Sequence, residues 1–392
     1  MSSSTSSSDA RASGSSSELG GGAEAVSGKR GGKGSRLFLL SMAGGLLASA
    51  AMATALPESW VHTPPEFGMA EAFEDHVTAA CAAKAKPELL IIGDSRAVAG
   101  VSAQEIAKVG ISVEKFALGG SGIFTGWAVL DRLIDCGVRP DKVVMAYGGV
   151  HVLDTGAMME RTTNYDLLKG PRASHAFAKA AEWEESTARR LAYKAMSIAG
   201  SDVTLVDLVL LQPALKHILE QPPAAVANSS GNEKERASFL ASAGDRFYGQ
   251  ANGTSDLPDE KQYTADKAVP RINREASAAI AKLGRDNGFE VLFYLLPVSE
   301  TAKAKLPSEL FATVERFRGE LDGLGIRAIN DVWTLPDADF GDPSHVNAIG
   351  RAKVTDDLLA RLATGELAVG RRADETDNAV SLAAQEGEKI GQ

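Results

Sequence analysis

The sequence is poor in the features on which several protein classes depend. Only two of its 392 residues are cysteines, too few for a disulfide scaffold, and no Cys-x-x-Cys pair is present for a zinc knuckle. Cationic residues are outnumbered, with 41 Lys and Arg against 51 Asp and Glu and a formal net charge of -10. A nucleic-acid-binding protein needs a concentrated basic surface, so we expect no nucleic-acid partner. We also expect no metal site and no cofactor, because no residue spacing indicates either.

The chain begins with a polar stretch, and a long uncharged run follows. Residues 1–36 are rich in Ser and Gly, and we expect them to form a disordered cytoplasmic tail. Residues 37–56 carry no charge over a length that matches the hydrocarbon core of a bilayer, and the cations before them orient the N-terminus toward the cytoplasm. This run is either a retained signal-anchor, which its length favours, or a signal peptide cleaved near Ala53-Thr54-Ala55.

Both interpretations of this run export the folded part of the protein. We expect a single-pass protein of the cytoplasmic membrane with a periplasmic domain, or alternatively a secreted protein. In an oxidising compartment Cys81 and Cys136 could form a disulfide. Two buried free thiols are the other reading, and the sequence leaves both open.

Short apolar runs alternate with helical patterns through the exported part, which is typical of an α/β protein with a five-stranded parallel sheet. We expect strands at 88–92, 111–118, 142–147, 289–296 and 326–330, and helices at 102–110, 127–136, 272–283, 308–324 and 348–362. A largely helical insertion at about 155–265 interrupts the alternation, with helices at 176–198 and 203–219 and a loop at 221–253. The predicted organisation is a juxtamembrane segment at 57–85, a domain at 86–363 and a polar C-terminal tail at 364–392.

The chemistry-bearing residues lie in four loops that follow strands, where the reactive groups of an open parallel sheet collect. These loops are Gly93-Asp94-Ser95-Arg96, Gly119-Gly120-Ser121-Gly122, Gly148-Gly149-Val150-His151 and Asp342 to Asn347. A serine hydroxyl needs a base within hydrogen-bond reach, and that base needs a third group to orient it. We therefore predict a catalytic triad in which Ser95 attacks, His345 accepts its proton and Asp342 orients the imidazole. The N–H groups of Ser95 and Gly122 are the predicted oxyanion donors.

These motifs resemble those of the SGNH (GDSL-like) hydrolase superfamily. The resemblance lies in Gly93-Asp94-Ser95 after an apolar strand, a glycine-bearing second loop, and Asp342-x-x-His345 before the last helix. It implies a flavodoxin-like three-layer α/β/α sandwich and the triad roles given above. The similarity covers about residues 86–153 and 266–363.

The third motif departs from that family. Its usual Gly-x-Asn-Asp provides an asparagine that donates to the oxyanion, whereas Val150 stands at the aligned position here. Either another group, such as His151, supplies that donor, or the oxyanion hole has two donors. Loss of one donor costs on the order of 3 kcal/mol of transition-state stabilisation. Membrane-anchored relatives, such as alginate O-acetylation proteins and the teichoic acid D-alanylation protein, also depart at this motif, and the anchored topology here resembles theirs.

Further residues around the triad are candidates for the pocket, namely Asp94, Arg96, Gly120, His151 and Asn347. For His151 two readings stay open, a pocket residue or a hydrogen-bonded core histidine. Arg96 could bind an anionic substrate, although we favour a solvated arginine at a helix edge. The four histidines outside these loops, His62, His76, His175 and His217, are expected to be structural or surface residues.

Together these features predict an exported, membrane-tethered serine enzyme that transfers an acyl or acetyl group to an extracytoplasmic polysaccharide. Its expected partners are an acyl donor, a glycan acceptor and a membrane protein that delivers the acyl group. One alternative is an esterase that acts on carbohydrate or small esters. The other is a catalytically silent polysaccharide-binding subunit.

Overall fold

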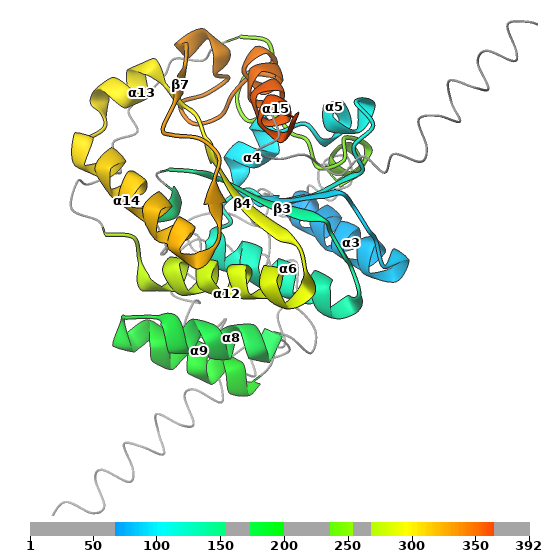
Figure 1. Cartoon of the computed structure of the whole chain (residues 1–392), viewed down its shortest axis with the longest axis vertical. Coiled ribbons are helices and arrows are strands. Elements are labelled where there is room, and N and C mark those ends of the chain that lie inside the picture. Colours follow the sequence, from blue (N-terminus) through cyan, green and yellow to red (C-terminus); the bar gives the residue numbers. More distant parts are fainter. Residues whose placement is uncertain (1–66, 150, 154–172, 200–235, 254–267, 364–392) are drawn as a thin grey trace, which may run out of the picture. The chain divides into compact units, whose positions relative to one another are not determined.

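The computed structural model describes residues 67–149, 151–153, 173–199, 236–253 and 268–363 (Figure 1). The expected cytoplasmic tail, the apolar run 37–56, the helix at 203–219 and the tail at 364–392 lie outside these residues. None of the helices that are described has the length and apolar character needed to cross a membrane.

A five-stranded parallel sheet forms the centre of the domain, as the sequence predicts. Its strands are β1 (Leu89–Gly93), β2 (Val113–Ala117), β3 (Lys142–Gly148), β4 (Glu290–Leu296) and β6 (Arg327–Ala328). They pair in the order β2-β1-β3-β4-β6, and every pairing is parallel. This is the 2-1-3-4-5 order of a doubly wound sheet, which places ligands outside the carboxyl ends of the strands. The last strand is shorter than predicted.

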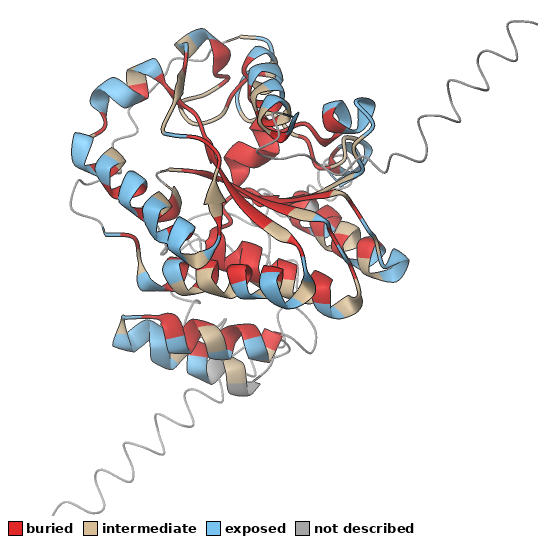
Figure 2. Ribbon diagram, viewed as in Figure 1, coloured by how far each residue is buried: buried red, intermediate tan, exposed pale blue. Residues whose placement is uncertain are grey.

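Helices cover both faces of the sheet, so β1, β3 and β4 are buried on both sides and consist of nearly continuous apolar runs. One face packs against α3 (Phe67–Ala83), α6 (Ile123–Cys136), α12 (Arg271–Asn287) and α14 (Ser308–Leu324). The other face packs against α4 (Ser95–Gly100), α5 (Ala103–Lys108) and α15 (Ala348–Ala363). The buried side of each helix faces the sheet (Figure 2).

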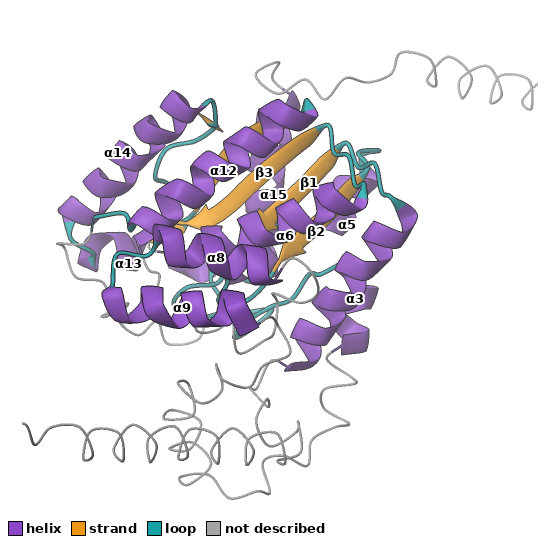
Figure 3. Cartoon of the chain, turned by 90° about the horizontal axis from the view of Figure 1, so that it is seen from below, coloured by secondary structure: helices purple, strands orange, loops and turns teal. Residues whose placement is uncertain are grey.

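The insertion contributes two helices, where the sequence predicted a single helix at 176–198. They are α8 (Ala173–Trp183) and α9 (Thr187–Ala199), and they lie outside α6 and α12 (Figure 3). Glu184 lies between the two helices, and its carboxylate accepts the N–H of Ser186 at 2.9 Å and a hydrogen bond from Arg189 of α9 at 2.9 Å. Trp183 packs against Trp127 of α6 with ring centroids 4.8 Å apart, which fixes α8 to the domain.

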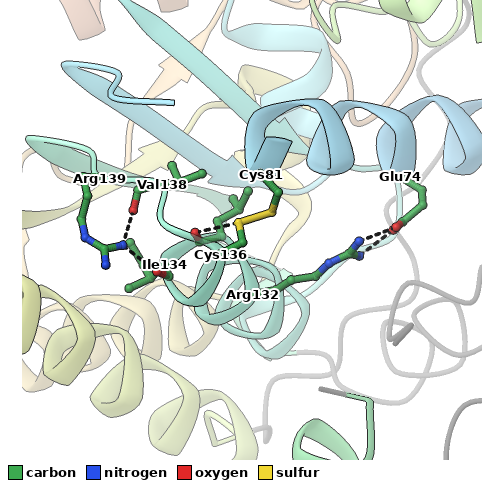
Figure 4. The surroundings of a disulfide bond; sticks show 8 residues. Glu74, Cys81, Arg132, Ile134, Cys136, Val138 and Arg139 are labelled. Carbon is green, nitrogen blue, oxygen red and sulfur yellow. Dashed lines mark hydrogen bonds and ion pairs between the residues drawn. A yellow bond between two sulfur atoms is a disulfide. The ribbon is translucent and has the colours of Figure 1, made fainter. Parts of the chain in front are cut away.

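Helix α3 belongs to the same core, although the sequence analysis treated this stretch as juxtamembrane. Met69, Phe73 and Val77 recur at helical spacing and are buried in the same hydrophobic core as the inner faces of α6 and α12. A disulfide joins Cys81 of α3 to Cys136 at the end of α6, with a Cα–Cα distance of 5.4 Å (Figure 4). The structure thus decides between the two readings of the cysteines, and it extends the folded part to Phe67.

Short elements lead from β4 toward the predicted triad loop. They are β5 (Val298–Ser299), α13 (Glu300–Lys305), β7 (Thr334–Leu335) and the 3-10 turn η4 (Asp337–Asp339). Strands β5 and β7 pair in parallel, and an antiparallel bridge between Phe340 and Val346 closes the loop that carries Asp342 and His345. Another 3-10 turn, η1 (His151–Leu153), follows β3.

Candidate active site

Ser95 lies at the carboxyl end of β1 as the first residue of α4. Asp94 precedes it as the N-cap, and its carboxylate accepts the N–H groups of Arg96 at 2.9 Å and Ala97 at 3.3 Å. Only glycine fits at position 93, since an added Cβ would lie 2.3 Å from the carbonyl oxygen of Ala146 on β3. The Asp94 cap thus fixes the start of α4 locally, and the neighbouring strand β3 requires the glycine at position 93.

The structure brings Ser95 together with the two residues that the sequence predicted as its partners. The Oγ of Ser95 lies 2.8 Å from Nε2 of His345, 250 residues away along the chain. The Nδ1 of the same imidazole lies 2.9 Å and 3.0 Å from the two carboxylate oxygens of Asp342. This hydrogen-bonded order of hydroxyl, imidazole and carboxylate is the arrangement that activates a serine nucleophile.

Asp342 is held by the backbone of its own loop. Its Oδ1 accepts the N–H groups of Ser344 and His345, each at 2.8 Å. Burial alone would raise the pKa of the Asp342 carboxyl, but hydrogen bonds and charge interaction with His345 lower it below the ordinary value. The carboxylate therefore stays ionised and fixes the proton of His345 on Nδ1, which leaves Nε2 to accept the proton of Ser95.

Two backbone N–H groups lie near the starts of α4 and α6, and the loop before α6 reaches the turn after β1 through the hydroxyl of Ser121, which donates to the carbonyl oxygen of Gly93 at 2.8 Å. The N–H of Ser95 opens α4, where the helix offers it no acceptor, and Gly122 is the extended N-cap of α6 at the end of the loop after β2. Neither N–H has a hydrogen-bond acceptor among the residues that the structure describes. Their role as oxyanion donors stays a prediction. Gly120, another predicted pocket residue, is buried in the same loop with a φ of +70°.

His151 makes a hydrogen bond to the residue that precedes the nucleophile. Its Nδ1 contacts the Oδ2 oxygen of Asp94, and the same oxygen accepts the N–H of Gly148 at 3.0 Å. Asp94 is fully buried, whereas the His151 side chain is 11% exposed. Burial alone would raise the pKa of Asp94, but His151, the Gly148 N–H and Arg96 lower it. His151 is thus hydrogen-bonded, as one reading of the sequence expected, and its placement in a pocket stays a prediction.

Arg96 and Asn347 differ from the sequence-based expectation. Arg96 is 3% exposed, so the favoured reading of a solvated arginine is wrong; it packs on Gly148, and its Nη1 lies 3.5 Å from the carbonyl oxygen of Pro297. Asn347 is 1% exposed and serves as the N-cap of α15 instead of lining a pocket. Its Oδ1 accepts the N–H groups of Ile349 and Gly350, and its Nδ2 donates to two carbonyl oxygens.

Residues 245–253, within the stretch predicted as loop, also belong to the site, which the sequence did not indicate. The ring of Tyr248 stacks on the imidazole of His345 with centroids 4.3 Å apart. Gly249 has a φ of +69°, and an added Cβ would lie 2.4 Å from the carbonyl oxygen of Gly341. The N–H of Gln250 donates to that same carbonyl at 2.9 Å. The segment therefore packs directly against the triad loop.

A buried ion pair anchors this segment to the edge of the sheet. Lys115 of β2 is 1% exposed and pairs with Asp245, while the hydroxyl of Ser102 donates to the same carboxylate at 2.7 Å. Burial lowers the pKa of Lys115 to about 8, although Asp245 opposes that shift. The aromatic pair Phe247-Tyr248 was a sequence signal that this segment packs against the domain, but nothing local indicated the ion pair.

No family model matches the chain, and no curated protein shows significant similarity to it. Within the described ranges, no group of three or more His, Cys, Asp or Glu residues is arranged to hold a metal ion. The function must therefore be argued from the geometry of the site.

Proposed function

We propose that the protein is a serine-dependent acyl-transfer enzyme that works through an acyl-serine intermediate. The observation that carries this proposal is the hydrogen-bonded chain from Ser95 Oγ through His345 to the carboxylate of Asp342. In the first half-reaction Ser95 attacks an ester carbonyl, and its proton moves to Nε2 of His345. Collapse of the tetrahedral intermediate releases the alcohol, which takes that proton, and the acyl group stays on Ser95.

In the second half-reaction His345 removes a proton from the acceptor, which then attacks the acyl-serine. We favour a hydroxyl of an extracytoplasmic glycan as acceptor, as the resemblance to membrane-anchored members of the SGNH superfamily suggests. The strand order and the position of Ser95 at a carboxyl edge support an SGNH-like arrangement. The disulfide between Cys81 and Cys136 supports an oxidising compartment. An esterase would differ only in its acceptor, which is water.

The test uses the full-length chain with a chromogenic acetyl ester and a fluorophosphonate, which reacts covalently with activated serines. We expect turnover, and labelling on the peptide that contains Ser95. The variant Ser95→Ala should lose both, with a fall in kcat of about 10⁴-fold or more. Ser308→Ala, on the exposed start of α14, is the matched control and should behave like the wild type.

Absence of turnover and labelling in the wild-type protein, together with binding of glycans, would instead identify a silent polysaccharide-binding subunit. A second measurement separates transfer from hydrolysis. Oligosaccharide acceptors are added to the reaction, and mass spectrometry follows the acetyl group. Acetylated oligosaccharide supports the transferase, whereas release of acetate alone identifies the esterase.

A further inference from the structure

A second histidine is fixed next to the nucleophile by a buried carboxylate. Asp94 immediately precedes Ser95, and its two carboxylate oxygens bind different groups. One caps α4 through the N–H groups of Arg96 and Ala97. The other accepts from the N–H of Gly148 and contacts Nδ1 of His151. The imidazole of His151 is therefore anchored to the same residue that sets the position of Ser95.

This anchoring leaves one polar atom of the ring for a ligand. Because Nδ1 is engaged with Asp94, Nε2 is the remaining nitrogen, and it has no hydrogen-bond partner in the part of the chain that the structure describes. The side chain is 11% exposed, so the ring reaches the surface at the carboxyl edge of the sheet. Strands β1 and β3 are adjacent there, with Gly93 paired to Ala146. The loop that carries His151 thus lies beside the turn that carries Ser95.

Building on the acyl transfer proposed above, we propose that His151 is a third oxyanion donor, acting as an imidazolium through its Nε2–H. When Ser95 Oγ bonds to the carbonyl carbon, the carbonyl π electrons move to the oxygen. The proton of Ser95 goes to His345, and His151 keeps its own proton while donating a hydrogen bond to the new oxyanion. With the N–H groups of Ser95 and Gly122, three donors then surround that oxygen.

The donor role sets a requirement on protonation. A neutral ring with its proton on Nδ1 presents only a lone pair at Nε2, whereas the imidazolium has an N–H on both nitrogens. Asp94 supplies the compensating negative charge. The other ionisable groups around this pair are Arg96, Tyr147 and, across Ser95, the pair of His345 and Asp342. Burial and the charge of Asp94 raise the pKa of Tyr147 well above its ordinary value, so Tyr147 stays neutral.

The donor role predicts a distinct pattern among variants at position 151. An amide N–H can replace the Nε2–H as a hydrogen-bond donor to the oxyanion, whereas an alanine side chain offers no donor. The variant His151→Asn should therefore retain most of the activity that His151→Ala loses.

The experiment measures kcat and KM for the acetyl ester in the full-length wild type and in His151→Asn and His151→Ala. We expect His151→Ala to lose about 10²- to 10³-fold, mainly in kcat. His151→Asn should stay within about tenfold of the wild type, because its amide N–H replaces the lost donor. His175→Asn, on the exposed side of α8, controls for the substitution itself. Thermal unfolding of each variant separates a folding defect from a catalytic one.

Two results would overturn the inference. The first is a His151→Asn variant as impaired as His151→Ala, and the second is a His151→Ala variant as active as the wild type. A neutral His151 that served as a base for the acceptor would give the first of these results, since neither asparagine nor alanine can accept the proton. Fluorophosphonate labelling of Ser95 keeps the proposals apart. If Ser95 is labelled while the His151 variants are as active as the wild type, only the oxyanion role of His151 is wrong. An unlabelled wild-type protein would contradict both the acyl-transfer function and the oxyanion role.

Discussion

The two sides of the candidate active site are supported in different ways. The nucleophile side consists of Ser95, Gly122 and His151, which follow three neighbouring strands of the buried sheet. The base side consists of Asp342 and His345, on a loop that follows none of those five strands directly. That loop is held by residues 245–253, for example through the hydrogen bond from Asn347 Nδ2 to the carbonyl oxygen of Gly253, 94 residues away. The strands of the sheet position the nucleophile side, whereas the position of the base side depends on a contact between segments distant in the sequence.

The largest expected effect tests the base side at its carboxylate. Asp342→Asn keeps the size of the side chain but removes the charge that holds the proton of His345 on Nδ1. We expect kcat to fall about 10⁴-fold, or about 5.5 kcal/mol, because the imidazole then populates the wrong tautomer. Steady-state kinetics with the acetyl ester measures this loss. A variant within tenfold of the wild type would show that Asp342 does not orient the base.

The second prediction tests the contact that supports the triad loop. Gly249→Ala forces an alanine into a left-handed conformation and against the carbonyl oxygen of Gly341. We expect a loss of about 3 kcal/mol in the free energy of unfolding and about 100-fold in kcat/KM. Gly319→Ala is the control, because this exposed glycine of α14 has open space around it and the change should stabilise the helix slightly. Equal behaviour of the two variants would refute the supporting role of residues 245–253.

The third prediction concerns the nucleophile side and its dependence on pH. The pKa of Asp94 is lower in the folded protein than in the unfolded chain, because His151, the Gly148 N–H and Arg96 outweigh the effect of burial. Its stabilising contribution is therefore complete above about pH 4 and is lost as the pH falls through the lower folded value. Asp94→Asn should lower the free energy of unfolding by about 2 kcal/mol at pH 6. Urea titrations should show that gap closing in acid; a gap that stays constant with pH would mean that the charge of Asp94 does not contribute.

The smallest expected effect tests the Tyr248 ring that stacks on the imidazole of His345. Tyr248 acts through His345, since its stacked ring restrains the imidazole and faces the positive charge that forms when the proton of Ser95 is taken up. We expect Tyr248→Ala to lower kcat about tenfold, or about 1.4 kcal/mol, with little change in KM. Tyr248→Phe keeps the ring and should stay close to the wild type. If the two variants were equally impaired, the hydroxyl and not the stacked ring would matter.

The nucleophile side could be predicted because its residues are close to strands that reveal themselves in the sequence. A strand buried on both faces must be apolar throughout, so β1 and β3 were visible as runs ending in glycine. The residues after those runs then had to meet at one edge of the sheet. The approach of His345 to Ser95 was also expected, from the Asp-x-x-His spacing before the last helix and the resemblance it supports.

Other features could not be predicted, because they depend on partners distant in the sequence. Asn347 was assigned to the pocket, but the start of α15 and two distant carbonyl groups use its amide completely. Arg96 was expected to be exposed to solvent, but its side chain packs directly against Gly148 and is buried there. Met69, Phe73 and Val77 recur at helical spacing in α3. This stretch was nevertheless predicted to be juxtamembrane, because it follows the apolar run at 37–56.

The sequence by itself determined the parallel sheet and the loops at its carboxyl edge, because burial on two faces, capping and turn geometry each act over a few residues. The choice of Ser95, His345 and Asp342 as partners rested in addition on the motif spacing and the resemblance it supports. The tertiary structure alone decided that Cys81 reaches Cys136, that Tyr248 covers His345 and that Asp94 holds His151. Each of these contacts joins segments that only the packed chain brings together, and no local pattern records which partner a side chain will meet.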